Sequence, residues 1–317
     1  MNVRTKFKCK QDKVAVRGTL REIYLIFVPD ELNGPLPPAC SWTSERKRCC
    51  SHESRIKLFY EASDRGVWSL GSRLVLKDRG PMGFPTREVQ TTQFVQEKTS
   101  ITVPTIVDSW EEDGHTLILM KRIPGESLHS AWPKLSTAEK ENIAQQTAES
   151  LLQLRDLHSD RIQVFGGRPV YACFLFPGSN GYGYPHGPFA TDDELWGEME
   201  RCLDKDVPEA ARIRLRSRMP PATPYTFTHG DLTDQHHGII DWELSGYYPV
   251  WWEYAYTSVP DSDEDKEWKA LLRRYLPDHS AAREFWLDYY WLCRDLGNER
   301  AAGFIEKTKK GALEREG

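Results

Sequence analysis

The chain has 317 residues, of which 39% are hydrophobic and 28% charged, and its formal net charge is −5. This length and apolar content are enough for one large or two modest globular domains. The longest apolar run, residues 24–28, is far too short to cross a bilayer, and no apolar segment of a secretory signal follows the basic N-terminus. Seven cysteines without a recognisable spacing indicate free thiols in a reducing compartment. We therefore expect a cytoplasmic protein with no membrane partner.

Charge is distributed unevenly along the chain. Residues 1–55 carry a net charge of +5 and the remainder carries −10. An acidic body disfavours nucleic acid as a partner and mildly favours a cationic small substrate, although ordinary solubilising charge explains it equally well. Residues 1–53 also contain several cysteines and a proline-rich stretch. They are predicted to form a poorly ordered N-terminal extension with one strand over 19–28.

From residue 54 onward, short β-type runs alternate with turn residues. The pattern predicts a small antiparallel sheet carrying one helix, in the order β-β-β-α-β-β. Asp113 and Gly114 suit the positive-φ positions of a two-residue hairpin turn between the last two strands. The expected strands span residues 54–63, 66–70, 72–77, 102–110 and 115–123, and the expected helix spans 84–99.

The remainder of the chain reads as mainly helical. Ser136 and Glu139 form a capping box at the start of a long helix that we expect to reach about His158. Its predicted apolar stripe ends with Leu151, Leu154 and His158. Further helices are expected at 191–204, 208–218, 263–275 and 279–296. The predicted fold class is therefore α+β, with a small sheet lobe over 54–123 and a larger helical lobe over 124–317.

Two charged residues of the small lobe suit phosphate binding. Phosphoryl transfer from a nucleotide needs a lysine for the phosphates and a glutamate that pairs with this lysine. Lys77 ends an apolar strand, and Glu88 lies early in the helix that follows. Each residue alone is as readily explained as an exposed side chain. The strand–helix order makes the pair more informative than either part.

A second motif lies in the helical lobe, within FTHGDLTDQHHGIIDWE (residues 227–243). His229, Gly230 and Asp231 have the form of a catalytic loop in which Asp231 accepts the proton of a substrate hydroxyl. Asp241 follows an apolar pair and is placed as a Mg²⁺ ligand. HGD alone is a weak signal, whereas HGD followed by IIDWE is much stronger.

Together these residues resemble the aminoglycoside phosphotransferase and choline-kinase-like family of protein-kinase-like fold. The sequence is similar to fungal members of unassigned substrate, and the likeness covers residues 55–296. The matching stretches are DRGVWSLGSRLVLK, TSITVPTIVDSWEEDG, LILMKRIPGESL, FTHGDL and GIIDWELSGYYPVWWEYA. The resemblance implies ATP- and Mg²⁺-dependent phosphorylation of a small-molecule hydroxyl. It assigns nucleotide binding to the small lobe and the substrate to the large one. It also assigns Lys77 and Glu88 to the ATP phosphates, Asp231 as the base, Asp241 to the metal, and Met120 to Ile123 to the adenine.

The loop departs from this family in one place. A kinase catalytic loop carries asparagine five residues after the aspartate, and His236 occupies that position here. Only ten positions separate Asp231 from Asp241, which is too few for the usual hairpin. Three interpretations remain: a degenerate enzyme, an active enzyme with altered metal binding, or a translation that omits part of the coding sequence. A pseudokinase that binds nucleotide without turnover is therefore the alternative function.

A metallohydrolase is the rival class. Imidazole and carboxylate side chains that cluster in one segment can bind Zn²⁺ and activate water. Adjacent histidines in an extended segment face opposite ways, however, and solvated loop histidines explain the pattern as well. The candidate ligands are His229, Asp231, His236, His237 and Asp241.

Aromatic residues follow the metal aspartate, from Tyr247 to Tyr256. They can stack on a sugar or a cation, but we expect them to pack in the core, with Trp252 and Tyr256 on one helical face. Glu253 is predicted to be structural and to bond the backbone of the catalytic loop.

Overall fold

A computed structural model describes residues 8–10, 13–15, 56–62, 65–80, 86–123, 125, 127–177, 184–232, 239–260 and 262–316. The chain divides into two compact units, Met1–Val89 with Pro104–Gly125, and Gln90–Val103 with Glu126–Gly317. Most of the predicted extension, including the strand expected at 19–28, lies outside the described residues. Within the extension, the short strands β1 (Lys8–Lys10) and β2 (Lys13–Ala15) pair in antiparallel fashion.

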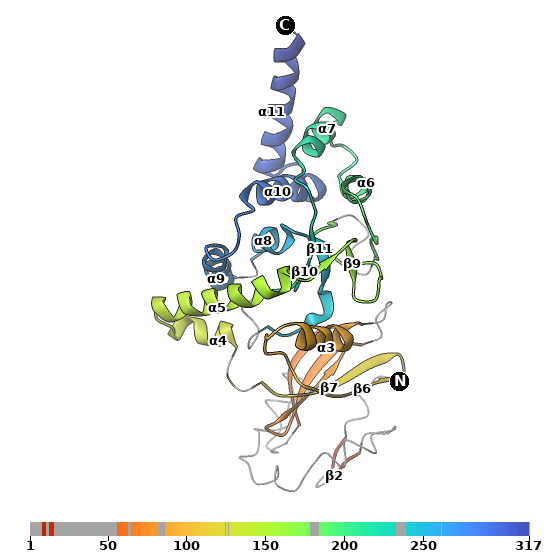
Figure 1. Cartoon of the computed structure of the whole chain (residues 1–317), viewed down its shortest axis with the longest axis vertical. Helices are drawn as coiled ribbons and strands as arrows, with labels where there is room; N and C mark the ends of the chain where they lie inside the picture. The colour runs from red at the N-terminus through yellow and green to blue at the C-terminus, as the bar shows by residue number, and fades with distance from the viewer. Residues whose placement is uncertain are drawn as a thin grey trace. The chain divides into compact units, whose positions relative to one another are not determined.

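The first unit contains a five-stranded antiparallel sheet in the order β3-β4-β5-β7-β6. Figure 1 shows β6 and β7 of this sheet side by side. Asp113 and Gly114 connect β6 to β7 with φ of 52° and 81°, as the hairpin signal predicted. Buried leucines alternate along the strands, so that one face of the sheet forms a small core. The strands are β3 (Ile56–Ala62), β4 (Arg65–Leu70), β5 (Leu74–Asp78), β6 (Ile106–Glu112) and β7 (His115–Lys121).

Helix α3 (Glu88–Lys98) is the predicted helix of this part of the chain. The helix begins at Glu88, later than the predicted residue 84, and the Thr86 hydroxyl accepts a hydrogen bond from the Glu88 amide at 3.2 Å. The boundary between the two units falls inside α3, after Val89. In the second unit, Phe94 of α3 packs against Phe165 and Phe227 with ring centroids 5.2 and 5.3 Å apart.

The second unit is mainly helical, as predicted. The capping box at Ser136 and Glu139 is present, but α5 ends at Arg155, so the prediction that it reaches His158 was wrong. His158 instead begins a short strand. Helix α11 was not predicted from the sequence. The helices are α4 (Leu128–Ala131), η3 (Trp132–Lys134), α5 (Thr137–Arg155), α6 (Asp192–Cys202), α7 (Glu209–Arg218), α8 (Trp252–Tyr256), α9 (Asp263–Arg273), α10 (Ser280–Arg294) and α11 (Glu299–Glu316).

A small four-stranded sheet lies within this helical unit, in the order β8-β10-β11-β9. Strand β10 (Tyr225–Thr228) pairs antiparallel with β11 (Gly246–Pro249), and Thr228 lies opposite Gly246. The segment that leaves β10 therefore starts beside the segment that enters β11, which brings residues 229–231 near residues 241–245. The outer strands are β8 (His158–Ser159) and β9 (Gln163–Val164).

Two buried apolar clusters support this unit. One surrounds α6, α7, α8 and α10, and the other joins α5 and α9 to the catalytic loop through Phe227, Leu232 and Trp242. Burial of each large side chain contributes on the order of 2 kcal/mol, so the loop is fixed to a rigid base. Among the described residues, no helix is both long and apolar enough to span a bilayer.

Candidate active site

Lys77 and Glu88 form a buried ion pair in the first unit. Lys77 Nζ lies 3.0 Å from Oε1 and 2.9 Å from Oε2 of Glu88, and the two side chains are 11% and 4% exposed. Strand β5 supplies the lysine near its end, and the first turn of α3 supplies the glutamate. The structure therefore brings together the two residues that strand–helix order had paired. An ammonium held in this way is suited to neutralising anionic oxygens.

The segment predicted to contact adenine lies at the end of β7. Met120 pairs with Val75 across the sheet, and the amide of Arg122 donates to the carbonyl of Arg73 at 2.7 Å. Met120 and Ile123 are both half-buried. The backbone of this segment is thus anchored to β5.

In the second unit, His229 follows β10 and is fully buried. Its Nδ1 lies 3.3 Å from the amide of Asp231, and its Nε2 lies 2.9 Å from the carbonyl of Ile240. Because an amide can only donate, Nδ1 must accept and Nε2 must carry the hydrogen. The ring also packs edge-on against Trp242, with centroids 4.8 Å apart. His229 therefore holds the two ends of the catalytic segment together.

Glu253 of α8 anchors the same loop through its backbone. Its Oε2 accepts the amide hydrogen of His229 at 2.8 Å, which confirms the predicted bond to the loop backbone. The hydroxyl of Ser245 donates to the carbonyl of His229 at 2.9 Å, so both backbone groups of that residue are satisfied. Gly230 has φ of 83°, and a Cβ there would lie 2.9 Å from the carbonyl oxygen of Leu244. The loop therefore requires glycine at this position.

Burial raises the pKa of the Glu253 carboxyl to about 7. The amides of His229 and Gly230 and the guanidinium of Arg155 favour its charged form, whereas the charge of Asp231 disfavours it. Burial outweighs these bonds because the side chain is removed from water.

Asp231 is half-buried and lies two residues beyond His229. Its Oδ1 accepts a hydrogen bond from the hydroxyl of Tyr256, at 3.0 Å. Tyr256 was predicted only as a core residue, and it is buried beside Trp252, with ring centroids 5.8 Å apart. The bond to Asp231 was missed, because it joins two segments with no shared sequence pattern.

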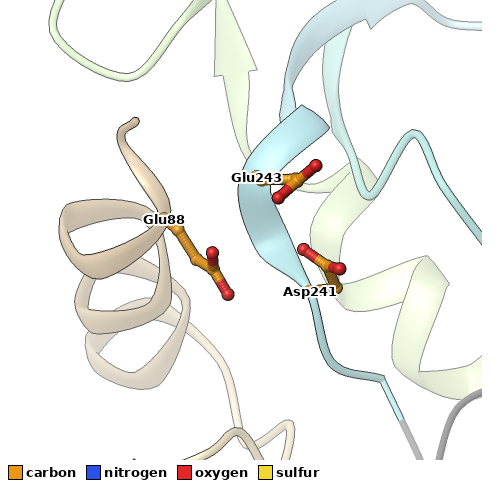
Figure 2. Close-up of side chains that lie close together, drawn as sticks. All are labelled: Glu88, Asp241 and Glu243. Carbon is orange, nitrogen blue, oxygen red and sulfur yellow. The ribbon is translucent and has the colours of Figure 1, made fainter. Parts of the chain in front are cut away.

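Asp241 directly precedes the short helix η4 (Trp242–Leu244) and adopts a left-handed conformation, with φ of 69°. Aspartate tolerates this region better than most residues. Glu243 lies within η4, and one of its carboxylate oxygens lies within 4.8 Å of one from Asp241. Figure 2 shows both side chains on this segment and Glu88 at the start of α3. Sequence reasoning missed Glu243 as a candidate ligand, although the D-x-E spacing was visible.

Residues 233–238, which include His236 and His237, lie outside the described residues. The metallohydrolase hypothesis therefore rests, among the described residues, on His229, Asp231 and Asp241. Both ring nitrogens of His229 are engaged with the backbone. This arrangement argues against His229 as a metal ligand.

A family model described as the Phosphotransferase enzyme family matches residues 62–285. The chain belongs to this phosphotransferase family. The matched range includes Lys77 and Glu88 of the first unit and Asp231 and Asp241 of the second. The comparison with curated protein sequences gives no match.

Solved structures of phosphotransferases share the fold. The ADP-bound aminoglycoside phosphotransferase APH(2'')-Ib is 14% identical, with a TM-score of 0.50, over 80% of this chain and 90% of that chain. The streptomycin–ATP complex of APH(2'')-IIa is 15% identical, with a TM-score of 0.47, over 80% and 90%. APH(3'')-Id from Streptomyces rimosus is 15% identical, with a TM-score of 0.42, over 75% and 92%. The predicted fold class is confirmed: an α+β kinase-like fold with an N-terminal antiparallel sheet and helix, then a mainly helical part.

Proposed function

We propose that this phosphotransferase transfers the γ-phosphoryl group of ATP to a hydroxyl of a small molecule. The anchored loop that carries Asp231, in a chain of this family, is the observation that supports the proposal most strongly. Phosphoryl transfer depends mainly on positioning and charge neutralisation, and both need rigid side chains.

On the nucleotide side, residues 54–123 bind ATP in this proposal. Lys77 contacts the phosphates, and Glu88 keeps the ammonium in place. Met120 to Ile123 contact the adenine, supported by the anchored backbone at the end of β7. The ADP-bound APH(2'')-Ib is a member of this fold whose nucleotide is known, and we extend that ligand class to the present chain.

On the acceptor side, residues 124–317 carry the chemistry. Asp231 accepts the proton of the substrate hydroxyl while the oxygen of that hydroxyl bonds to the γ-phosphorus. The bond between that phosphorus and the β–γ bridging oxygen breaks, and ADP leaves. Asp231 is half-buried, so it is not wholly removed from solvent.

Asp241 and Glu243 fit a Mg²⁺ ion in the same proposal. They offer carboxylate oxygens, the donors that Mg²⁺ prefers, and these oxygens come from one short segment. When bound, the ion neutralises charge on the phosphates. Glu243 also offers an oxygen ligand in a chain that has histidine at the usual asparagine position.

The experiment that tests the proposal measures phosphate transfer or ATP hydrolysis with Mg²⁺ for the wild type, Asp231→Asn and Asp160→Asn. The asparagine at 231 keeps an acceptor for Tyr256 but cannot take a proton, so turnover should fall by two orders of magnitude or more. Asp160 is exposed and serves as the matched control. Unchanged turnover in Asp231→Asn would exclude Asp231 as the base.

The same protein preparations distinguish the pseudokinase alternative from the proposed function. A protein that binds nucleotide without turnover should show ADP binding by calorimetry and no phosphate release above the level of Asp231→Asn. Phosphate release that copurifies with the wild-type protein would reject this alternative.

A further inference from the structure

Tyr256, at the end of α8, is a buried tyrosine whose hydroxyl contacts the candidate base. Its hydroxyl donates to Asp231 Oδ1 at 3.0 Å, and only 4% of the residue is exposed. A hydrogen bond from a fixed donor to a carboxylate restricts the rotation of that carboxylate. Core packing explains the ring of Tyr256 but not the direction of its hydroxyl.

Three groups hold the ring in place. Trp252 lies one helical turn earlier on α8, with ring centroids 5.8 Å apart. Phe174 packs edge-on from another segment, with centroids 5.5 Å apart. The ammonium of Lys269 on α9 lies 5.4 Å from the ring centroid, which is within the range of a cation–π contact. The hydroxyl of Tyr256 therefore has a defined position relative to Asp231.

Lys269 is itself buried. Its ammonium lies 2.7 Å from Asp265 Oδ2, and the two side chains are 1% and 0% exposed. It also donates to the carbonyl of Val259 at 2.7 Å, which fixes the chain just beyond α8. A buried charge is expensive unless it is paired and bonded, as it is here. A positive charge over the ring makes the phenol hydrogen a stronger donor, because it stabilises electron density that moves onto the ring.

We propose that Tyr256 is a positioning residue for phosphoryl transfer: its hydroxyl orients the Asp231 carboxylate toward the acceptor hydroxyl, and the Asp265–Lys269 pair holds the tyrosine. This inference rests on the proposed function, because it assigns a role relative to the base. It goes beyond that function because it identifies a further residue, and a supporting ion pair, that set the geometry of the proton transfer.

The test compares Tyr256→Phe with Tyr254→Phe in the full chain. Phenylalanine at 256 keeps the ring against Trp252 and Lys269 and removes only the hydroxyl. Tyr254 lies on the same helix, but its hydroxyl faces Asp278 and Ser280, at 3.4 and 3.2 Å. Steady-state kinetics of phosphate transfer or ATP hydrolysis with Mg²⁺ give kcat and the KM for ATP. Calorimetry gives the affinity for ADP.

We expect Tyr256→Phe to lower kcat about tenfold, with the KM for ATP and the affinity for ADP changed less than about twofold. Tyr254→Phe should keep the wild-type kcat. An unchanged kcat in Tyr256→Phe, while Asp231→Asn is inactive, overturns this inference and leaves the proposed function intact. Loss of ADP binding together with kcat would show a merely structural role and would also overturn it. A wild-type protein without turnover removes both proposals.

Discussion

Replacing Glu253 by glutamine should change how the stability of the protein depends on pH. The carboxyl lies under the catalytic loop, and burial raises its pKa from 4.5 to about 7. Between these values the folded protein binds a proton that the unfolded chain releases. The contribution of Glu253 to the free energy of unfolding is therefore largest below about pH 4.5 and is lost as pH rises through about 7.

The size of the effect follows from the shift. Each pKa unit corresponds to about 1.4 kcal/mol, so the full change is about 3 kcal/mol, of which about 2.5 kcal/mol falls between pH 5 and pH 8. Glutamine keeps an oxygen that accepts from the amide of His229, but it does not titrate. We therefore expect Glu253→Gln to gain stability relative to the wild type by about this amount as pH rises.

Urea unfolding followed by tryptophan fluorescence measures the difference at pH 5, 6, 7 and 8. Eight of the eleven tryptophans lie in residues 126–317, so the signal reports mainly the unit that contains Glu253. The exposed Glu209 gives a control, Glu209→Gln, for the change in net charge. A stability difference between the wild type and Glu253→Gln that stays constant with pH, or a relative gain in stability by the wild type as pH rises, would contradict this expectation.

Two further predictions concern buried ion pairs. Lys77→Met removes the cation beside Glu88 and should lower the free energy of unfolding by about 3–5 kcal/mol, whereas Lys77→Met with Glu88→Gln should cost clearly less. Equal losses in urea unfolding would show that the charge of Glu88 is not desolvated. Lys269→Met should likewise destabilise more than the double change Lys269→Met with Asp265→Leu. Thermal unfolding midpoints that fall further in the double variant would contradict this expectation.

The secondary structure of both units was largely predictable, because local patterns decide it. Short β-type runs between turn residues mark the strands of the sheet, the Asp113–Gly114 pair marks the hairpin, and the Ser136–Glu139 box marks the start of α5. The errors lie where the local signal is weak. His158 fits a helical period but pairs with Thr226 in a strand, so a tertiary partner overrode the local pattern.

The residues of the candidate site were nominated by the order of motifs, but sequence could not give their contacts. Lys77 and Glu88 were paired because the strand that ends in the lysine is followed by the helix that carries the glutamate early. Glu253 was expected to bond the loop backbone, and its carboxylate accepts the amide hydrogen of His229. Glu243 and Tyr256 were missed as partners of the site, because nothing in their spacing distinguishes a ligand from a core residue.

By itself the sequence determined the α+β organisation, the order of the elements and the identity of the charged residues along the chain. These properties follow from the periodicity and the order of the residues, and both can be read directly from the amino-acid sequence. Only the tertiary structure decided which nitrogen of His229 carries the hydrogen, how deeply Glu253 is buried, and that Tyr256 bonds Asp231 from 25 positions away. Those properties depend on desolvation and on contacts between segments that fold together, and such contacts leave no periodic trace in the chain.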